Sequence, residues 1–320
     1  IEKKKNIFKK TKYILTLPQY ISWIFSKKFS SEISYLGNHT HLWNFKKNSY
    51  SSFTNRLKIK NKLPEIKNAW KTVGFYLLDK RLKNNKIKVI NGIHDSDASY
   101  LLFTRSKFKK FNLISSGTQF VTMNAFTSSK CLRDGKEMYG GINIFGKVVP
   151  TIRFMGGREY EVLNRKLKIS KKLEKFDPFF FEKQKYLYPT FGIGGPFSEM
   201  KGNYKNFIKE NHATRYMAII TYITFVLNYC MDLINCRENI IITGPLINNF
   251  NILKILNSLR SEQKIYISSN QEGTGFGACL LFDLKKKINL NLKLYKCSKI
   301  PNVNSSYKYW LTNLKKKTNQ

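Results

Sequence analysis

The segment NGIHDSDAS, residues 91–99, combines the residue types that acid–base chemistry needs. His94, Asp95 and Asp97 follow directly after an apolar run, KIKVI. A carboxylate placed after the end of a buried strand can act as a general base, because it accepts the proton of an incoming hydroxyl. The same residues can begin a helix, with Asp95 or Ser96 accepting hydrogen bonds from its first backbone amides. The segment alone leaves both interpretations open for Asp95, and we interpret Asp97 as a helix-start residue.

Two further segments contain small residues that would let an anion approach the backbone. SSGT, residues 115–118, separates two β-rich runs within 111–126, which predicts a hairpin. Backbone N–H groups and hydroxyls of such a turn can contact phosphate oxygens, although a plain hairpin turn needs the same glycine. ITGPLINN, residues 242–249, follows an apolar run and is typical of a strand that ends in a turn.

The elements that would position these residues alternate between strands and helices in the second half of the chain. We expect a buried helix near 213–234, a strand and turn over 239–249, a helix over 250–260, the strand KIYIS, and a Gly-rich segment, 272–282, before a helix. This alternation predicts an α/β domain with a partly parallel sheet.

In the first half of the chain the expected elements are shorter. We expect a helix within 11–30 that is interrupted at or begins at Pro18, and a loop over 32–45. A short apolar strand that ends in glycine is expected over 86–93, followed by a helix from Ser96 to about Thr104. FMGGREYEVL, residues 154–163, predicts a Gly–Gly turn before a helix.

The charge of the chain is strongly basic, with 57 Lys and Arg against 20 Asp and Glu and a formal net charge of +37. The basic residues are mostly lysines, scattered through every segment among Asn, Ile, Phe and Tyr, which is the composition that an A/T-rich gene encodes. A phosphate-binding face needs clustered charge. We therefore interpret the lysines as solvated surface and expect no nucleic-acid partner; a basic nucleic-acid-binding protein is the alternative.

The five cysteines are an odd number without a CxxC pair, which argues against a disulfide framework or a zinc site. We expect a reducing, cytoplasmic compartment. The apolar segment 216–234 contains Thr221, Asn228 and Asp232, so we expect a core helix and no membrane association.

Taken in order, these motifs resemble the FGGY family of carbohydrate kinases. The resemblance is carried by NGIHDSDAS (91–99), LISSGT (113–118), IIITGPLINN (240–249) and GTGFGACLLF (273–282), with softer support from 17–44. HDSDAS together with ISSGT leans toward the rhamnulokinases and fuculokinases. The resemblance implies an α/β protein with two actin-like, ribonuclease-H-like domains. It implies a partial N-terminal domain in residues 1–106 and a complete C-terminal domain in 107–320.

The resemblance also implies an activity and its site residues. The implied reaction is ATP-dependent phosphorylation of a sugar, with ATP and Mg²⁺ as cofactors; a homodimer is left open, and so is the identity of the sugar. The implied roles are Asp95 as catalytic base, His94 and Gly92 at the sugar, Ser116, Gly117 and Thr118 at the ATP phosphates, and Gly244, Asn248 and Gly275 at the adenosine. Gly275, Gly277 and Ala278 would let a helix approach closely.

The chain departs from the family pattern in two places. Pro245 stands where the family's adenosine turn has a second glycine, and proline lacks the N–H group. No Asp-x-Gly-Thr-like phosphate loop precedes Asp95. We therefore expect an N-terminally truncated kinase that is inactive by itself, with strand 86–93 lacking its pairing partners. The alternative is a remnant that binds a sugar or nucleotide without catalysis.

Overall fold

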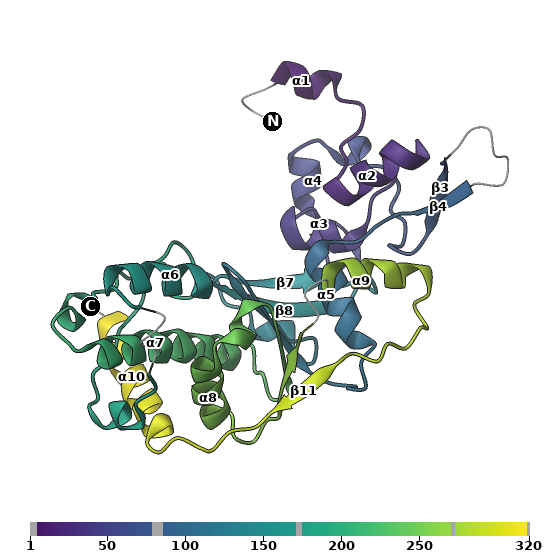
Figure 1. The fold of residues 1–320 in the computed structure, drawn as a ribbon. Helices are drawn as coiled ribbons and strands as arrows, with labels where there is room; N and C mark the ends of the chain where they lie inside the picture. The colour runs from purple at the N-terminus through teal and green to yellow at the C-terminus, as the bar shows by residue number, and fades with distance from the viewer. Residues whose placement is uncertain (1–4, 79–85, 171–174, 270–272, 319–320) are drawn as a thin grey trace. The chain divides into compact units, whose positions relative to one another are not determined.

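The computed structural model describes residues 5–78, 86–170, 175–269 and 273–318 (Figure 1). Its contacts divide the chain into two compact units. Unit 1 comprises residues 1–109, 140–149 and 272–289, and unit 2 comprises 110–139, 150–271 and 290–320. Both units are discontinuous in sequence. The predicted domains, 1–106 and 107–320, are continuous in sequence and are defined differently from these units, so that division stays a prediction.

Unit 1 is built from short helices and two strand pairs. Its helices are α1 (Lys5–Lys10), α2 (Leu17–Ser26), α3 (Ile33–His39), α4 (Ser52–Arg56), α5 (Asp95–Thr104) and α9 (Gly273–Cys279). Its strands pair antiparallel, β1 (Trp43–Asn44) with β2 (Ser49–Tyr50) and β3 (Thr72–Leu77) with β4 (Lys86–Ile90).

Helix α2 begins at Leu17, with Pro18 as its second residue, so Pro18 lies at the start of the helix and does not interrupt it. Proline lies in the first turn, where its missing N–H removes no helical hydrogen bond. The helix ends at Ser26, and the residue that caps it, Lys27, has a φ of 56° in the left-handed region. Helix α5 covers almost the predicted range, since it starts at Asp95 and ends at Thr104.

Two expectations for unit 1 are wrong. The segment expected to be a loop over 32–45 contains helix α3, because the side chain of Glu32 accepts hydrogen bonds from the first amides of that helix. The strand expected to lack pairing partners is β4, which pairs antiparallel with β3. Strand β3 is not predicted from the sequence, since its residues (TVGFYL) follow no strict alternation of polar and apolar positions.

A seven-stranded sheet is formed by strands that lie between residues 112 and 295. Its order is β11 (Leu292–Tyr295), β10 (Ile265–Ser268), β9 (Ile240–Thr243), β5 (Asn112–Ser116), β6 (Phe120–Met123), β8 (Val148–Phe154) and β7 (Met138–Ile142). Strands β10, β9 and β5 run parallel, whereas β11 and β6 pair antiparallel with their neighbours. The prediction of an α/β protein with a partly parallel sheet is confirmed.

Four helices of unit 2 pack with this sheet around one apolar core. They are α6 (Gly156–Lys166), α7 (His212–Leu233), α8 (Phe250–Leu259) and α10 (Val303–Thr318). Figure 1 shows α7 running beside α8 and α10. Helix α7 has the length and composition of a membrane span, but 89% of its most apolar window is buried inside the structure. It is the core helix that the sequence analysis expected.

The glycines of GTGFGA lie inside a helix rather than before one. They belong to α9, which packs against α5 within unit 1. A Cβ placed on Gly277 would lie 1.8 Å from the carbonyl oxygen of Ala98. The small residues of this segment were expected to let a helix approach closely, and Gly277 does so, because it lets α9 cross α5 at a distance that excludes a side chain.

Candidate functional site

Asn91 anchors the loop that leads into α5. Its side chain is fully buried: the amide oxygen accepts from the Ser30 hydroxyl at 2.7 Å, and the amide nitrogen donates to the carbonyl oxygens of Ser31 and Lys67 at 3.1 and 2.8 Å. Its backbone carbonyl accepts from Gln19 Nε2 at 3.0 Å. Because buried polar groups are costly when unsatisfied, these bonds fix the backbone of the loop. The sequence gives no signal for this role of Asn91, because its partners are 60 residues or more away in the chain or lie in other segments.

Gly92 and His94 complete the turn into the helix. Gly92 has a φ of 96°, a region that favours glycine, and a Cβ there would lie 3.3 Å from Cβ of Pro18. His94 occupies the N-cap position, and its backbone N–H donates to Ser34 Oγ at 3.1 Å. The predicted roles of Gly92 and His94 at a sugar stay predictions.

Asp95 presents a carboxylate to solvent from the first turn of α5. Its side chain is 77% exposed, and its Oδ1 accepts from the backbone N–H of Ser96 at 2.7 Å. The same oxygen lies 3.2 Å from Nε2 of His94. A carboxylate at a helix N-terminus is favoured by the helix dipole. Asp95 therefore begins the helix and also offers an exposed oxygen, so the two interpretations are compatible.

Asp97 is buried against the other nitrogen of the same ring. Its Oδ2 lies 3.3 Å from Nδ1 of His94 and accepts from Nδ2 of Asn38 at 2.6 Å. Burial raises the pKa of Asp97 to about 6, against the contacts with His94 and Asn38, which lower it. Its place in the first turn agrees with the interpretation as a helix-start residue, but its burial was not expected.

Glu32 is a second buried acid of unit 1. It accepts from the backbone amides of Ser34 and Tyr35 at 3.0 and 3.3 Å, and burial raises its pKa to about 7. Ser34 Oγ links it to the backbone of His94. The chain has only 20 acidic residues, so the gathering of three of them (Glu32, Asp95 and Asp97) around one histidine marks a candidate site.

The predicted hairpin of 111–126 is present in unit 2, as the antiparallel pair β5 and β6. The start of α6 packs against its turn. The N–H of Arg158 donates to the carbonyl oxygen of Thr118 at 3.0 Å, and a Cβ on Gly157 would lie 2.0 Å from the carbonyl oxygen of Gly117. The two glycines that were expected to form a turn before this helix lie in its first turn, and Gly157 is required there by this close approach.

The side chain of Ser116 joins this turn to the next one in the sheet. Its hydroxyl donates to the carbonyl oxygen of Thr243 at 2.6 Å and accepts from the N–H of Leu246 at 3.0 Å. Gly244 has a φ of 86°, and a Cβ there would lie 2.0 Å from the carbonyl oxygen of Ser116. The turns after β5 and after β9 are therefore in direct contact.

A small apolar cavity of about 150 Å³, which we call the slot, opens where these two turns meet the helices of unit 2. It is lined by Gly117, Phe120, Gly157, Tyr160, Ile223, Pro245, Leu246, Asn249 and Ile252. The side chain of Asn249 donates to the Tyr160 hydroxyl at 3.3 Å and accepts from the N–H of Ile252 at 3.0 Å.

The three residues predicted to contact adenosine have different surroundings. Gly244 lies in the turn that borders the slot. Asn248 is exposed, and the asparagine that lines the slot is the next one, Asn249. Gly275 belongs to unit 1, where a Cβ on it would meet no atom within 4 Å. The sequence pattern pointed to the turn that borders the slot but gave no means to choose between the consecutive asparagines.

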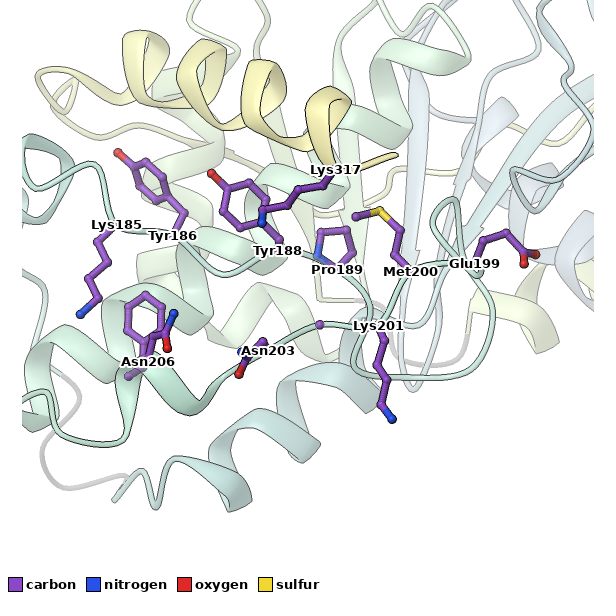
Figure 2. Close-up of a pocket in the computed structure, with 12 residues that line it drawn as sticks. Lys185, Tyr186, Tyr188, Pro189, Glu199, Met200, Lys201, Asn203, Asn206 and Lys317 are labelled. Carbon is purple, nitrogen blue, oxygen red and sulfur yellow. The ribbon is translucent and has the colours of Figure 1, made fainter. Parts of the chain in front are cut away.

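A larger cavity of unit 2, of about 510 Å³, is lined by other residues (Figure 2). Two of its lysines already have partners there. Lys185 forms an ion pair with Glu210, and Lys317 lies alongside the ring of Tyr188, with its ammonium 5.3 Å from the ring centre. We assign no role to this cavity.

The described residues do not form a site for Mg²⁺ by themselves. Among them, no group of three His, Cys, Asp or Glu side chains is placed to hold a metal ion. Mg²⁺ takes oxygen ligands in octahedral geometry. Of the two aspartates beside His94, Asp97 is buried and contacts both Asn38 and the ring, which leaves the exposed carboxylate of Asp95.

Comparison with known proteins identifies the family of this fold. Residues 108–290 match the family described as carbohydrate kinase FGGY, C-terminal domain. No curated protein sequence matches the chain. A carbohydrate kinase from Novosphingobium aromaticivorans superposes with a TM-score of 0.81 at 24% identity, over 94% of this chain and 69% of that one.

Two further solved structures are similar. A gluconate kinase from Lactobacillus acidophilus gives a TM-score of 0.79 at 14% identity, over 99% of this chain and 69% of its own. The glycerol kinase of Plasmodium falciparum, solved with ADP, gives 0.73 at 15% identity, over 98% and 69%. At such identities the likeness shows the fold, so the actin-like fold expected from the sequence is confirmed.

Proposed function

Because the chain belongs to the FGGY family of carbohydrate kinases, we propose that it acts in the ATP-dependent phosphorylation of a sugar hydroxyl. The observation that carries the proposal is the slot. The two turns that the motif order assigns to ATP, 116–118 and 244–249, are in contact and together line one apolar cavity. An apolar cavity beside a glycine-containing turn suits a nucleoside with a phosphate chain.

In this proposal the turn after β5 holds the phosphates of ATP and the slot holds the nucleoside. Ser116, Gly117 and Thr118 form the phosphate turn, in which small residues let the backbone approach the anion. Pro245 and Asn249 line the slot at the turn that begins with Gly244, so proline contributes an apolar ring where a second glycine would leave the backbone bare. Asn248 and Gly275 keep their predicted adenosine roles as proposals. The ADP in the Plasmodium falciparum structure supports this choice of ligand.

Asp95 is the proposed general base. Its carboxylate takes the proton of the sugar hydroxyl while the oxygen of that hydroxyl forms a bond to the γ-phosphorus of ATP. The bond between this phosphorus and the β–γ bridging oxygen breaks, and ADP leaves with the electron pair. His94, fixed between Asp95 and Asp97, orients the carboxylate, and Gly92 allows the sharp turn before it. A bound Mg²⁺ would neutralise phosphate charge, and the residues that the structure describes supply no complete set of ligands for it.

The extent of the activity is part of the proposal. The 320 residues cover 69% of the length of each of the three kinases described above. We propose that the chain is the nucleotide-binding part, with the candidate base, of a cytoplasmic sugar kinase, and that it has no turnover by itself. The lean toward rhamnulokinases and fuculokinases stays a prediction, as does a homodimer.

The experiment measures binding and turnover separately. Calorimetry with ADP tests the slot, and sugar-dependent formation of ADP is followed over a panel of sugars that includes rhamnulose and fuculose. We expect ADP to bind and no sugar to be phosphorylated by these 320 residues alone. Failure to bind ADP would contradict the proposal. Binding that persists without turnover, even after the N-terminus is extended with a family phosphate loop, would favour the non-catalytic alternative.

A further inference from the structure

We propose that the hydroxyl of Ser116 is a positioning group that sets the width of the slot by tying the phosphate turn, 116–118, to the nucleoside turn, 244–249. The inference rests on the proposed function of the slot. It assigns Ser116 a different task from the phosphate contact that its place in the SSGT motif suggests.

The hydrogen bonds of Ser116 exclude its hydroxyl as a donor to phosphate. A serine hydroxyl has a single hydrogen to donate. In this structure the hydrogen is given to the carbonyl oxygen of Thr243 at 2.6 Å, and one lone pair accepts from the N–H of Leu246 at 3.0 Å. The side chain is buried, and the remaining lone pair cannot bind an anionic oxygen. The hydroxyl therefore bridges two segments about 130 residues apart in sequence.

The bridge acts on the two turns that border the slot. Gly117, next to the bridging serine, lines it from one turn, and Leu246, whose N–H is held by the bridge, lines it from the other. A change in the hydrogen bonds of Ser116 would therefore move Gly117 and Leu246 relative to each other and change the width of the slot. No other side-chain hydrogen bond described for this structure joins these two turns.

Pro245 makes the nucleoside turn dependent on this bridge. Proline has no N–H, and the next amide in the chain, that of Leu246, is the one that Ser116 accepts. The amides of Ile247 and Asn249 donate to carbonyl oxygens inside the turn, Gly244 O at 3.2 Å and Leu246 O at 3.0 Å. These three amides are therefore already hydrogen-bonded within the protein, and the conformation of the turn that borders the slot depends on the hydrogen bond from Leu246 to Ser116.

Packing on both faces leaves the phosphate turn little room to compensate. A Cβ on Gly244 would lie 2.0 Å from the carbonyl oxygen of Ser116, and one on Gly157 would lie 2.0 Å from that of Gly117. Both distances are far below a van der Waals contact. The turn is thus packed between the end of β9 and the start of α6, and the hydroxyl of Ser116 makes its hydrogen bond to the β9 side.

The first test compares Ser116→Ala with Ser258→Ala. Ser258 is a matched bridge outside the slot: it is 3% exposed, donates to Lys254 O at 3.0 Å and accepts from the N–H of Ile300 at 3.0 Å. Both variants should lose similar thermal stability. We expect Ser116→Ala to weaken ADP binding in calorimetry about tenfold, the equivalent of one hydrogen bond, whereas Ser258→Ala binds ADP like the unaltered chain.

The second test keeps the serine and widens the contact from the other side. Gly244→Ala adds a methyl group against the Ser116 carbonyl at a φ of 86°. Gly135→Ala is the control, because Gly135 has a φ of 70° and a Cβ there meets no atom within 4 Å. The control measures backbone strain alone. We expect Gly244→Ala to weaken ADP binding by more than about tenfold and Gly135→Ala to leave it unchanged.

These outcomes separate this inference from the proposed function. If the unaltered chain binds ADP and both Ser116→Ala and Gly244→Ala bind it equally well, the positioning role is wrong while the nucleotide site stands. If Ser258→Ala weakens ADP binding as much as Ser116→Ala, the effect is one of general stability and the positioning role is also wrong. If the unaltered chain does not bind ADP, the proposed function and this inference fall together.

Discussion

The ring of His94 lies between two aspartates, with Nδ1 3.3 Å from Oδ2 of the buried Asp97 and Nε2 3.2 Å from Oδ1 of the exposed Asp95. The two carboxylates are two residues apart on one helix, yet one faces solvent and the other the interior of unit 1. Different surroundings of this kind separate the roles of two acids. The exposed one is available to a substrate, and the buried one holds the ring.

Replacing Asp95 by asparagine should abolish most of the turnover in any active form of the chain. Asparagine keeps the shape but cannot accept the hydroxyl proton as a carboxylate does, so kcat should fall at least about a hundredfold while KM for the sugar changes little. Steady-state kinetics with the phosphorylated sugar measures both values. Asp134→Asn, an exposed acid of unit 2, is the control and should keep full activity. A kcat within about threefold of the unaltered enzyme would remove Asp95 as the base.

The buried acids should make the stability of unit 1 depend on pH. Burial holds the pKa of Asp97 at about 6 and that of Glu32 at about 7, above the ordinary values of 3.8 and 4.5. The folded chain therefore binds these protons more tightly than the unfolded chain does. Their contribution to the free energy of unfolding is largest below about pH 4 and is lost as the pH rises through 6 and 7.

Asp97→Asn should remove part of this dependence. As the pH rises from about 4.5 to 8, the unaltered chain loses the contribution of Asp97 to its free energy of unfolding, whereas the amide has no proton to lose. The free energy of unfolding of the variant minus that of the unaltered chain should therefore increase by about 2 kcal/mol over this range. Urea denaturation at both pH values measures the difference. Glu65→Gln, whose side chain is 78% exposed, is the control and should follow the unaltered chain. A constant difference between Asp97→Asn and the unaltered chain would show that Asp97 does not titrate in this range.

The sequence predicted the elements whose signals are local and strong. The hairpin around SSGT, the buried helix α7, the strand that begins IIITGPLINN and the strand KIYIS follow from hydrophobic runs and turn residues. The resemblance to a kinase family then assigned roles that no single segment indicates. Helix α3 was missed because its cap is a buried glutamate, whereas short polar residues are the usual N-cap signal.

The detailed contacts of the site could not be predicted, because they join segments far apart in the chain. The anchor at Asn91 depends on partners as distant as Gln19, and the bridge of Ser116 on Thr243 and Leu246. No spacing rule connects such residues. The same motif that suggested a phosphate contact for Ser116 contains, in the folded chain, a serine whose only hydrogen is already used.

The positive charge should not give the chain a specific nucleic-acid site. Lysines are spread over both units, and several lie over aromatic rings, such as Lys27 over Trp23 and Lys136 over Phe197. We expect weak binding to duplex DNA that falls at least about a hundredfold between 50 and 200 mM salt and shows no sequence preference, as for a purely electrostatic contact. Titrations of two unrelated duplexes at both salt concentrations measure this. Sequence-selective binding that resists salt would contradict the interpretation.

Two glycines of α9 should respond in opposite ways to the same substitution. Gly277→Ala places a Cβ 1.8 Å from the carbonyl oxygen of Ala98 on α5, so the helices must separate, and the free energy of unfolding should fall by about 2 kcal/mol or more. Gly275→Ala meets no atom within 4 Å, and alanine is the better helix former, so stability should be unchanged or rise by up to about 1 kcal/mol. Urea denaturation of both variants gives the comparison. Equal losses would show that the contact between α5 and α9 does not depend on the glycine. An unstable Gly277→Ala beside a stable Gly275→Ala would establish that the backbone of α9 lies against the helix that begins with Asp95.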